Sequence, residues 1–185
     1  MITSRFEVEA TALQSDGKLV AAGFFVTDDD SSPFVVARFN PDGSLDASFN
    51  TDGMVATRVG TCDDQASGIA IQPDGKILVV GTSYNVGEGS GITVLRYLGD
   101  GHQDSTFGDL GIVRLGLSSG YDQGQVLSLA EDGTIVVVGE SGLFPHQRIA
   151  LILDGHGKIA EQPKPYPMPK SALLPTQPDY RVEVF

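Results

Sequence analysis

Acidic side chains in the first quarter of the chain are the first candidates for chemistry. One compact run of carboxylates is made by three consecutive residues, Asp28, Asp29 and Asp30. Two further carboxylates, Asp42 and Asp46, flank a turn sequence in which oxygen-bearing side chains alternate. Because Ca²⁺ prefers oxygen ligands, these residues are the metal site that the sequence offers, with calcium as the cofactor. We favour the other interpretation, a solvated loop and an ordinary Asp-Gly turn, and apart from this candidate calcium we expect no cofactor.

Three other groups resemble catalytic or ligand-binding motifs. The segment 116–120 has the spacing of a hydrolase nucleophile turn, which needs a following helix, whereas a strand is predicted there. A phosphate-cradling loop also needs a helix after it, and we expect only a flexible loop around Gly87, Gly89 and Gly91. Zinc-ligand spacing is absent from the three histidines, His102, His146 and His156. We therefore assign no catalytic and no cofactor-binding residue.

The elements that would position these residues repeat along the chain. The turn Asp16-Gly17 recurs as Asp74-Gly75 and Asp132-Gly133, at a constant spacing of 58 in residue number. The same spacing separates three isolated glycines, Gly23, Gly81 and Gly139. Phe107 also follows Phe49 at this spacing, and the spacing becomes less exact only in the third copy. Such self-similarity is typical of repeat architectures.

Each repeat contains the pattern of four short strands joined by turns. In the second copy the predicted strands cover residues 66–71, 77–80, 92–97 and 112–115. The continuous apolar runs 77–80 and 135–138 predict strands that are buried on both faces. We therefore predict an all-β protein with three four-stranded antiparallel blades of a β-propeller, an incomplete ring within one chain. The alternative is a β-solenoid, whose coils are usually shorter and more uniform.

The repeat resembles a known family. The stretch 70–81, which reads AIQPDGKILVVG, and the stretch 36–46, which reads VARFNPDGSLD, are similar to the delta-60 repeat of bacterial β-propeller proteins. The resemblance covers about residues 7–160 and departs in the third copy, where Ile152 stands at the position of Arg38 and Arg96. It implies a propeller fold, and it implies no activity or functional residue.

The predicted domain organisation is three repeats within residues 1–161, at about 7–61, 65–118 and 123–161. A Pro-rich linker is predicted over 162–178 and a terminal strand over 179–185. Because propellers use about four to eight blades, three blades do not close a ring. We expect the ring to be completed by another copy of this chain or by further propeller repeats, and we favour a piece of a longer protein.

Charge and hydropathy limit the partners and the location. The formal net charge of −12 repels phosphate backbones and anionic lipid surfaces, so we expect neither nucleic acid nor a membrane as partner. The sequence has no signal-peptide pattern and no apolar run long enough to span a membrane. The expected location is extracellular or cell-surface if the chain belongs to a longer exported protein, and cytoplasmic otherwise.

The sequence favours a non-enzymatic binding or structural scaffold over an enzyme, because the repeats are regular and no catalytic group stands out. A protein or a glycan is the expected ligand class, and a glycan-binding propeller is one alternative. The other alternative is a hydrolase or lyase with its site at the propeller axis, assembled from loops of several blades.

Overall fold

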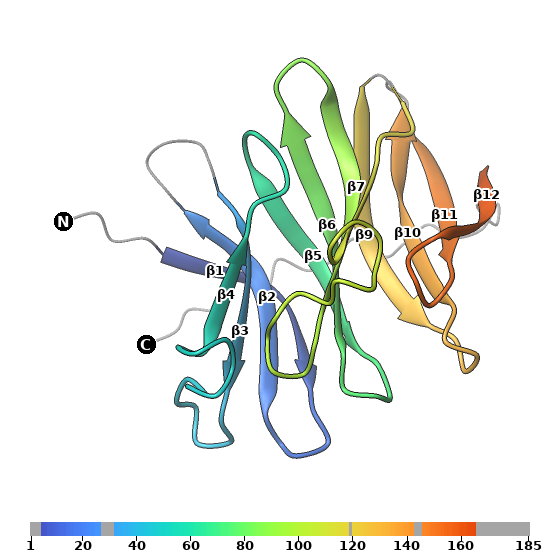
Figure 1. Ribbon diagram of the computed structural model, residues 1–185. Coiled ribbons are helices and arrows are strands. Elements are labelled where there is room, and N and C mark those ends of the chain that lie inside the picture. The colour runs from blue at the N-terminus through green and yellow to red at the C-terminus, as the bar shows by residue number, and fades with distance from the viewer. Residues whose placement is uncertain (1–4, 27–31, 119, 143–145, 166–185) are drawn as a thin grey trace, which may run out of the picture.

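The computed structural model describes residues 5–26, 32–118, 120–142 and 146–165, which form three four-stranded sheets (Figure 1). Blade one contains β1 (Arg5–Leu13), β2 (Leu19–Val26), β3 (Phe34–Phe39) and β4 (Met54–Thr57). Blade two contains β5 (Asp64–Ile71), β6 (Ile77–Asn85), β7 (Gly89–Tyr97) and β8 (Ile112–Leu115). Blade three contains β9 (Tyr121–Leu129), β10 (Ile135–Gly142), β11 (Gln147–Leu153) and β12 (Ile159–Pro165).

The four strands of every blade follow one another in the sheet as they do along the chain, and each pair is antiparallel. This arrangement confirms the predicted propeller blades, and the β-solenoid alternative is wrong because each sheet is made of consecutive antiparallel strands. Across the described ranges, no helix has the length and apolar character needed to cross a membrane.

The blades pack face to face through their first strands. β5 lies against β1 and β2 of blade one, and β9 lies against β5, β6 and β7 of blade two. The first strand of each blade is therefore the innermost, and the fourth strand lies at the outer edge of its sheet.

Two hydrophobic cores fill the spaces between the three blades. β6 contributes to both, because Ile77 and Val79 point into the first core whereas Leu78 and Val80 point into the second. This two-sided burial explains the continuous apolar run at 77–80. The equivalent prediction for 135–138 is wrong in part, because only the face toward blade two is buried and Val136 and Val138 are half-buried.

The isolated glycines that recur once in each repeat sit where the second strand of a blade crosses a bulge in the first strand. A Cβ atom built on Gly81 would lie 2.0 Å from the carbonyl oxygen of Gln65 and 2.7 Å from the ring of Phe34. Gly23 and Gly139 face the same obstruction, with the nearest carbonyl oxygen at 1.7 and 2.1 Å. Only glycine allows the two strands to approach this closely.

Two loops differ from the sequence-based expectation. The flexible loop expected around Gly87, Gly89 and Gly91 is a short hairpin turn, because β6 continues to Asn85 and β7 begins at Gly89. In blade three, β12 extends to Pro165, so the first residues of the predicted Pro-rich linker, 162–165, belong to a strand. The rest of the linker and the predicted strand at 179–185 lie outside the described residues.

The substitution Gly81→Ala is expected to destabilise the protein by about 2 kcal/mol or more, because the new methyl group forces the two strands apart. Urea denaturation measures this loss. Gly116→Ala is the matched control, since no neighbouring heavy atom lies within 4 Å of a Cβ atom there. The control is expected to change stability by less than about 0.5 kcal/mol, and equal stabilities of the two variants would contradict the close approach.

Candidate functional site

The calcium candidates fall into separate hydrogen-bond groups. Asp42 closes its own turn, because its Oδ1 accepts hydrogen bonds from the backbone N–H of Ser44 at 3.0 Å and from the Ser44 hydroxyl at 2.6 Å. These bonds hold the pKa of Asp42 below its ordinary value. The run Asp28–Asp30 lies outside the described residues.

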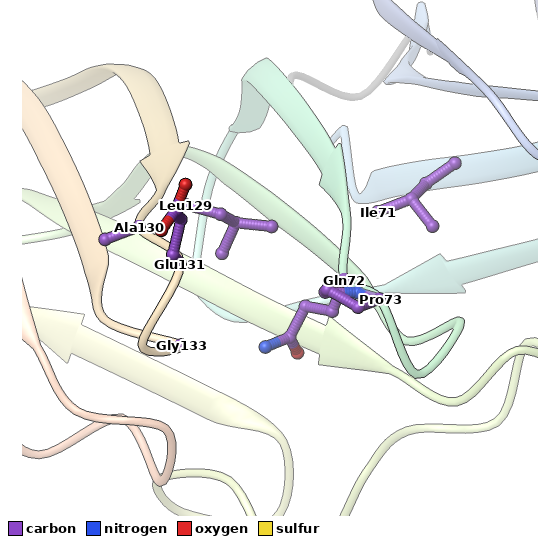
Figure 2. A pocket seen from close by; sticks show the side chains of 7 residues that line it. All are labelled: Ile71, Gln72, Pro73, Leu129, Ala130, Glu131 and Gly133. Atoms are coloured by element: carbon purple, nitrogen blue, oxygen red, sulfur yellow. The ribbon is translucent and has the colours of Figure 1, made fainter.

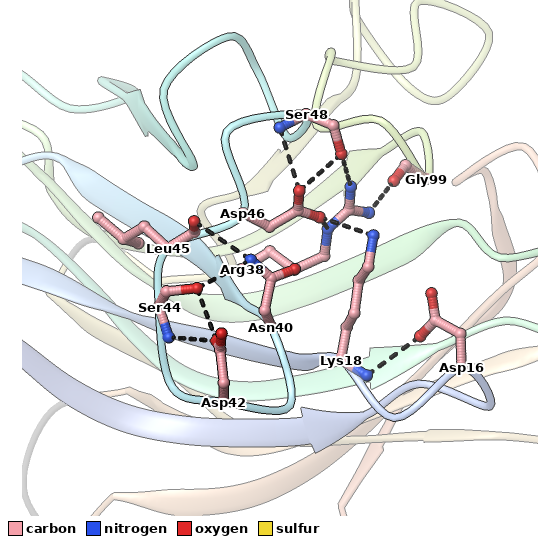
Figure 3. Close-up of polar contacts among 10 residues, drawn as sticks. All are labelled: Asp16, Lys18, Arg38, Asn40, Asp42, Ser44, Leu45, Asp46, Ser48 and Gly99. Carbon is pink, nitrogen blue, oxygen red and sulfur yellow. Dashed lines mark hydrogen bonds and ion pairs between the residues drawn. The ribbon is translucent and has the colours of Figure 1, made fainter.

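Asp46 is buried and neutralised by two cations, as Figure 3 shows. Its Oδ2 accepts from Lys18 Nζ at 2.9 Å and from Arg38 Nε at 2.7 Å, while Oδ1 accepts from the Ser48 hydroxyl at 2.7 Å. The bonds from Lys18, Ser48 and Arg38 hold the pKa of Asp46 well below its usual range. Within the described ranges, no three acidic, His or Cys side chains converge as a metal site requires. Calcium binding by Asp42 and Asp46 stays a prediction.

Blade two repeats the Asp46 arrangement at the equivalent positions. Arg96 Nε donates to Asp104 Oδ2 at 2.9 Å, and the Thr106 hydroxyl donates to Asp104 Oδ1 at 2.6 Å. The guanidinium lies over the ring of Phe107, 4.5 Å from its centroid, just as Arg38 lies 4.8 Å from the centroid of Phe49. The arginines and aspartates are at most 7% exposed, and both phenylalanines are fully buried.

Each arginine reaches across to the following blade. Nη1 of Arg38 donates to the carbonyl oxygen of Gly99 in blade two, a contact visible in Figure 3. Nη1 of Arg96 donates to the carbonyl oxygen of Gly155 in blade three. Guanidinium suits this role because its planar fork bonds to a carboxylate on one side and to a carbonyl on the other.

Two further contacts accompany each arginine. Asn50 N–H donates to the carbonyl oxygen of Asp100 at 2.8 Å, and Gly108 N–H donates to that of His156, also at 2.8 Å. The Phe rings lie against bare glycines, because a Cβ atom on Gly101 would be 3.0 Å from Phe49 and one on Gly157 would be 2.8 Å from Phe107. We call this set of Arg, Asp, Phe and backbone N–H the inter-blade clasp.

The clasp was not predicted from the sequence, and one of its residues was given a different role. It treated Asp46 as a calcium candidate, and it used Arg38 and Arg96 only as marks of the repeat. The available signal was that Arg, Asp and Phe recur together at positions 38, 46, 49 and 96, 104, 107. No sequence signal identifies the acceptors, because they are backbone carbonyls.

A groove lies at the inner end of the junction between blades two and three, where the β5–β6 and β9–β10 hairpins meet (Figure 2). Its volume is about 300 Å³ and its lining residues are Ile71, Gln72, Pro73, Leu129, Ala130, Glu131 and Gly133. The walls are mostly apolar, and Glu131 is the one acidic lining residue. Gln72 Oε1 is buried and accepts no hydrogen bond from the described residues. We call it the inner groove, because it is formed by the turns that follow the first strands of blades two and three, β5 and β9.

The remaining sequence candidates have structural roles. In the segment 116–120 the Ser118 hydroxyl donates to Asp122 Oδ1 at 3.0 Å, and no helix follows, so this contact closes the connection between blades two and three. His102 lies beside Asp100 in an exposed turn, with Nδ1 and Oδ1 3.2 Å apart. The ring of His146 packs on Tyr121 at a centroid distance of 4.7 Å. Cys62, the single cysteine, is half-buried.

Comparison with known proteins supports the repeat. Residues 14–49 and 72–107 match a family described as a domain of unknown function (DUF5122) beta-propeller. Both segments are thus similar to repeats of this β-propeller family. Each matched segment includes the Arg, Asp and Phe of one clasp and ends one residue before its backbone N–H donor. The prediction of a β-propeller repeat family is confirmed.

One solved structure similar to this chain is that of a fucose lectin from Kordia zhangzhouensis in complex with methyl-fucoside. The two chains are 9% identical with a TM-score of 0.44, and the match covers 84% of this chain and 99% of that chain. So distant a likeness says nothing about what the present chain binds. Comparison with curated proteins finds no match.

The substitution Arg96→Leu is expected to destabilise the protein by about 3 kcal/mol, because it removes the hydrogen-bonded cation of the buried Asp104 carboxylate and leaves only Lys76, whose Nζ lies 3.9 Å from Asp104 Oδ2. Urea denaturation measures the loss, and Arg5→Leu is the control because the Arg5 side chain is 77% exposed in its ion pair. The control is expected to cost about 0.5 kcal/mol or less. The double variant Arg96→Leu/Asp104→Leu should recover part of the loss, and equal costs for Arg96 and Arg5 would contradict a buried clasp.

Stability is expected to fall in acid. The pKa is lowered by hydrogen bonds and neighbouring charges in seven aspartates, Asp42, Asp46, Asp74, Asp100, Asp104, Asp132 and Asp154. For Asp104 burial opposes this, but the bonds from Thr106 and the charge of Arg96 outweigh it. A folded pKa below the unfolded value of 3.8 gives stability that is present above that value and is lost as the pH falls through the folded pKa.

Asp64 acts in the opposite direction, because burial raises its pKa despite hydrogen bonds from the backbone of Val59 and Gly60. With seven lowered groups against this one, the urea midpoint should be similar at about pH 7 and 5 and lower at about pH 3. An unchanged or higher midpoint at about pH 3 would show that the turn aspartates contribute nothing to folding.

Proposed function

We propose that this chain is a non-enzymatic β-propeller repeat module, which serves as a binding or structural scaffold within a larger assembly or a longer protein. The observation that carries this proposal is the inter-blade clasp. The distinctive charged residues of the repeat, Arg38 and Arg96 with their aspartates, bond to the next blade and to one another. These side chains therefore hold neighbouring blades together and are not available to bind a ligand.

The number of blades supports the assembly part of the proposal. Three blades form two junctions, whereas propellers close with about four to eight blades. Another copy of this chain or further repeats would supply the remaining blades. The scaffold would then present its loops and its inner groove to a protein or a glycan.

The enzyme alternative has the inner groove as its natural site. Glycoside hydrolysis typically needs two carboxylates that flank the scissile bond, and the groove has only Glu131 among its lining residues. A hydrolase or lyase built there would depend on that one side chain, together with the amide of Gln72.

The glycan alternative has a different surface in its favour. The rings of Tyr121 and His146 are in contact, tilted by 39° to each other, next to the β10–β11 connection, and Tyr84 interacts with Tyr121. Aromatic rings with polar edges offer sugars both an apolar face and hydrogen bonds. This patch is therefore where a glycan would be sought first.

The purified chain is expected to show no turnover above buffer with generic ester, phosphate and glycoside substrates. The variant Glu131→Gln should behave identically in this panel, with the exposed Glu9→Gln as its matched control. A turnover that Glu131→Gln removes and Glu9→Gln retains would overturn the non-enzymatic proposal.

A glycan array with the wild-type chain and the Tyr121→Ala variant tests the glycan alternative. If that alternative holds, the wild type binds a glycan and the variant loses the binding.

A further inference from the structure

Three buried apolar residues of blade one belong to neither hydrophobic core. They are Ala21 on β2, which is 2% exposed, and Val35 and Ala37 on β3, which are fully buried. The residues that precede them point into the core shared with blade two, and side chains alternate along a strand. The three residues therefore lie on the opposite face of the sheet, which we call the outer face of blade one. Every other buried apolar residue in the described ranges belongs to one of the two cores.

No described strand packs on the outer face of blade one. Within the described ranges, β2 and β3 contact β1 and β4, their neighbours in the sheet, and β5 of blade two. β5 packs on the other face, because Ala66 joins the core to which Val20 and Val36 belong. The burial of the outer face therefore needs a cover that the described strands do not supply.

The covered area is narrower than a blade. It includes the two middle strands of the sheet, whereas the flanking strands are open on the same face. Val8 and Leu13 on β1 are 49% and 70% exposed, and Ala56 on β4 is exposed as well. In blade two the equivalent of Val8 is Ala66, which is only 3% exposed at the junction with blade one. A cover limited to the middle of the sheet has the width of one extended segment.

The side chains on the middle strands are also small. Ala21 and Ala37 stand where blade two has Val79 and Leu95, which fill the space toward blade one. Smaller side chains allow a cover to come closer to the sheet, and they leave room for side chains that the cover brings. The outer face of blade one thus differs in shape from the face that blade two presents to its neighbour.

Two segments outside the described ranges adjoin blade one, and neither suits this position. Residues 1–4 precede Arg5, which pairs with Val26 at the end of β2. Ala21 lies five positions away along β2, or about 17 Å, whereas four residues span at most about 14 Å. Residues 27–31 are Thr, three Asp and Ser, whose polar groups would lose hydration on an apolar surface without gaining partners there.

The C-terminal segment has the length and the pattern that the cover needs. The twenty residues 166–185 follow β12, and a chain of this length reaches as far as about 70 Å. Among them, residues 179–185 contain no proline and alternate as a strand does, with Tyr180, Val182 and Val184 on one side. Blade three already has its fourth strand in β12, so this segment is not needed there.

We propose that residues 179–185 lie on the outer face of blade one in the same chain, with Val182 and Val184 packed on its buried residues. This inference goes beyond the proposed scaffold function, because it distinguishes the two end blades. The segment occupies the surface on which a preceding blade would pack, whereas the outer face of blade three stays available, with half-buried Val136 and Val138. Further blades therefore join at blade three, and blade one accepts a neighbour only after the segment has left.

Thiol labelling of Val35→Cys tests the proposal, with Cys62→Ser removing the native thiol. A chain that ends at residue 178 should be labelled at position 35 at least about tenfold faster than the full chain, because the cover is gone. In the full chain, Val182→Asp/Val184→Asp should have the same effect. Its matched control is Arg181→Ala/Glu183→Ala, which changes the other side of the segment and should leave position 35 protected.

Val36→Cys reports in each variant whether blade one is folded, because Val36 is fully buried on the opposite face of the same strand. Slow labelling at position 35 in the shortened chain would overturn the proposal, since the cover would then come from elsewhere. Fast labelling at position 35 with slow labelling at position 36 supports it.

A disulfide test in the intact chain decides the case in which the shortened chain is labelled fast at both positions. Val184→Cys is combined with Val35→Cys on blade one or with Val136→Cys on blade three, each with Cys62→Ser. The bond within one chain should form at least about tenfold faster with position 35, because docking raises the effective concentration of the two thiols.

Equal rates, or a faster reaction with position 136, would overturn the proposal. A disulfide that joins two chains at position 35 would also overturn it, because the cover would then belong to a second copy. All these outcomes leave the scaffold function intact, which fails separately through catalytic turnover by the chain.

Discussion

A buried arginine that bonds at once to its own blade and to the next one is the interaction on which the assembly of this protein depends. A guanidinium removed from water is costly unless its charge is paired and its N–H groups are used. Asp46 and Asp104 supply the charge, and the carbonyls of Gly99 and Gly155 use the outer nitrogen. Because the acceptor belongs to the neighbouring blade, the arginine is satisfied only when the blades are stacked. The clasp thereby converts a generic apolar contact between sheets into one fixed register.

Glycines on the accepting blade also make this register possible. The ring of Phe49 lies where a side chain on Gly101 would be, and the ring of Phe107 lies where one on Gly157 would be. Both glycines also have φ near +90°, a conformation that favours glycine in a tight turn. Turn geometry and blade contact therefore demand the same residue at the same place. The recurrence of Asp-Gly or His-Gly there reflects both constraints. From the sequence, turn chemistry alone accounts for the glycine, so the second constraint, the contact with the Phe ring of the preceding blade, leaves no separate sign.

Much of the fold could be predicted because the repeat period and the turn signatures are local properties of the sequence. The constant spacing of Gly23, Gly81 and Gly139 is enough to place the second strand of each blade along the chain. The clasp could not be predicted, because its acceptors are carbonyls on another blade and leave no side-chain pattern. Residues 162–165 were assigned to a linker because prolines indicate one, yet they belong to β12, an edge strand, which is where a sheet tolerates proline.

The clasp has a direction, and the direction distinguishes the three blades. Blade two both donates to blade three through Arg96 and accepts from blade one through Gly99. Blade three accepts, but Ile152 leaves it without the donor that the repeat normally supplies. Blade one donates through Arg38, and no described residue donates a hydrogen bond to the carbonyls of Pro41 and Asp42, which stand where Gly99 and Asp100 accept in blade two. Among the described residues the chain thus has one free acceptor and no free donor of this kind. Because clasps match only donor with acceptor, any ring containing this chain needs different chemistry at the outer face of blade three, where half-buried Val136 and Val138 offer apolar surface instead of charge.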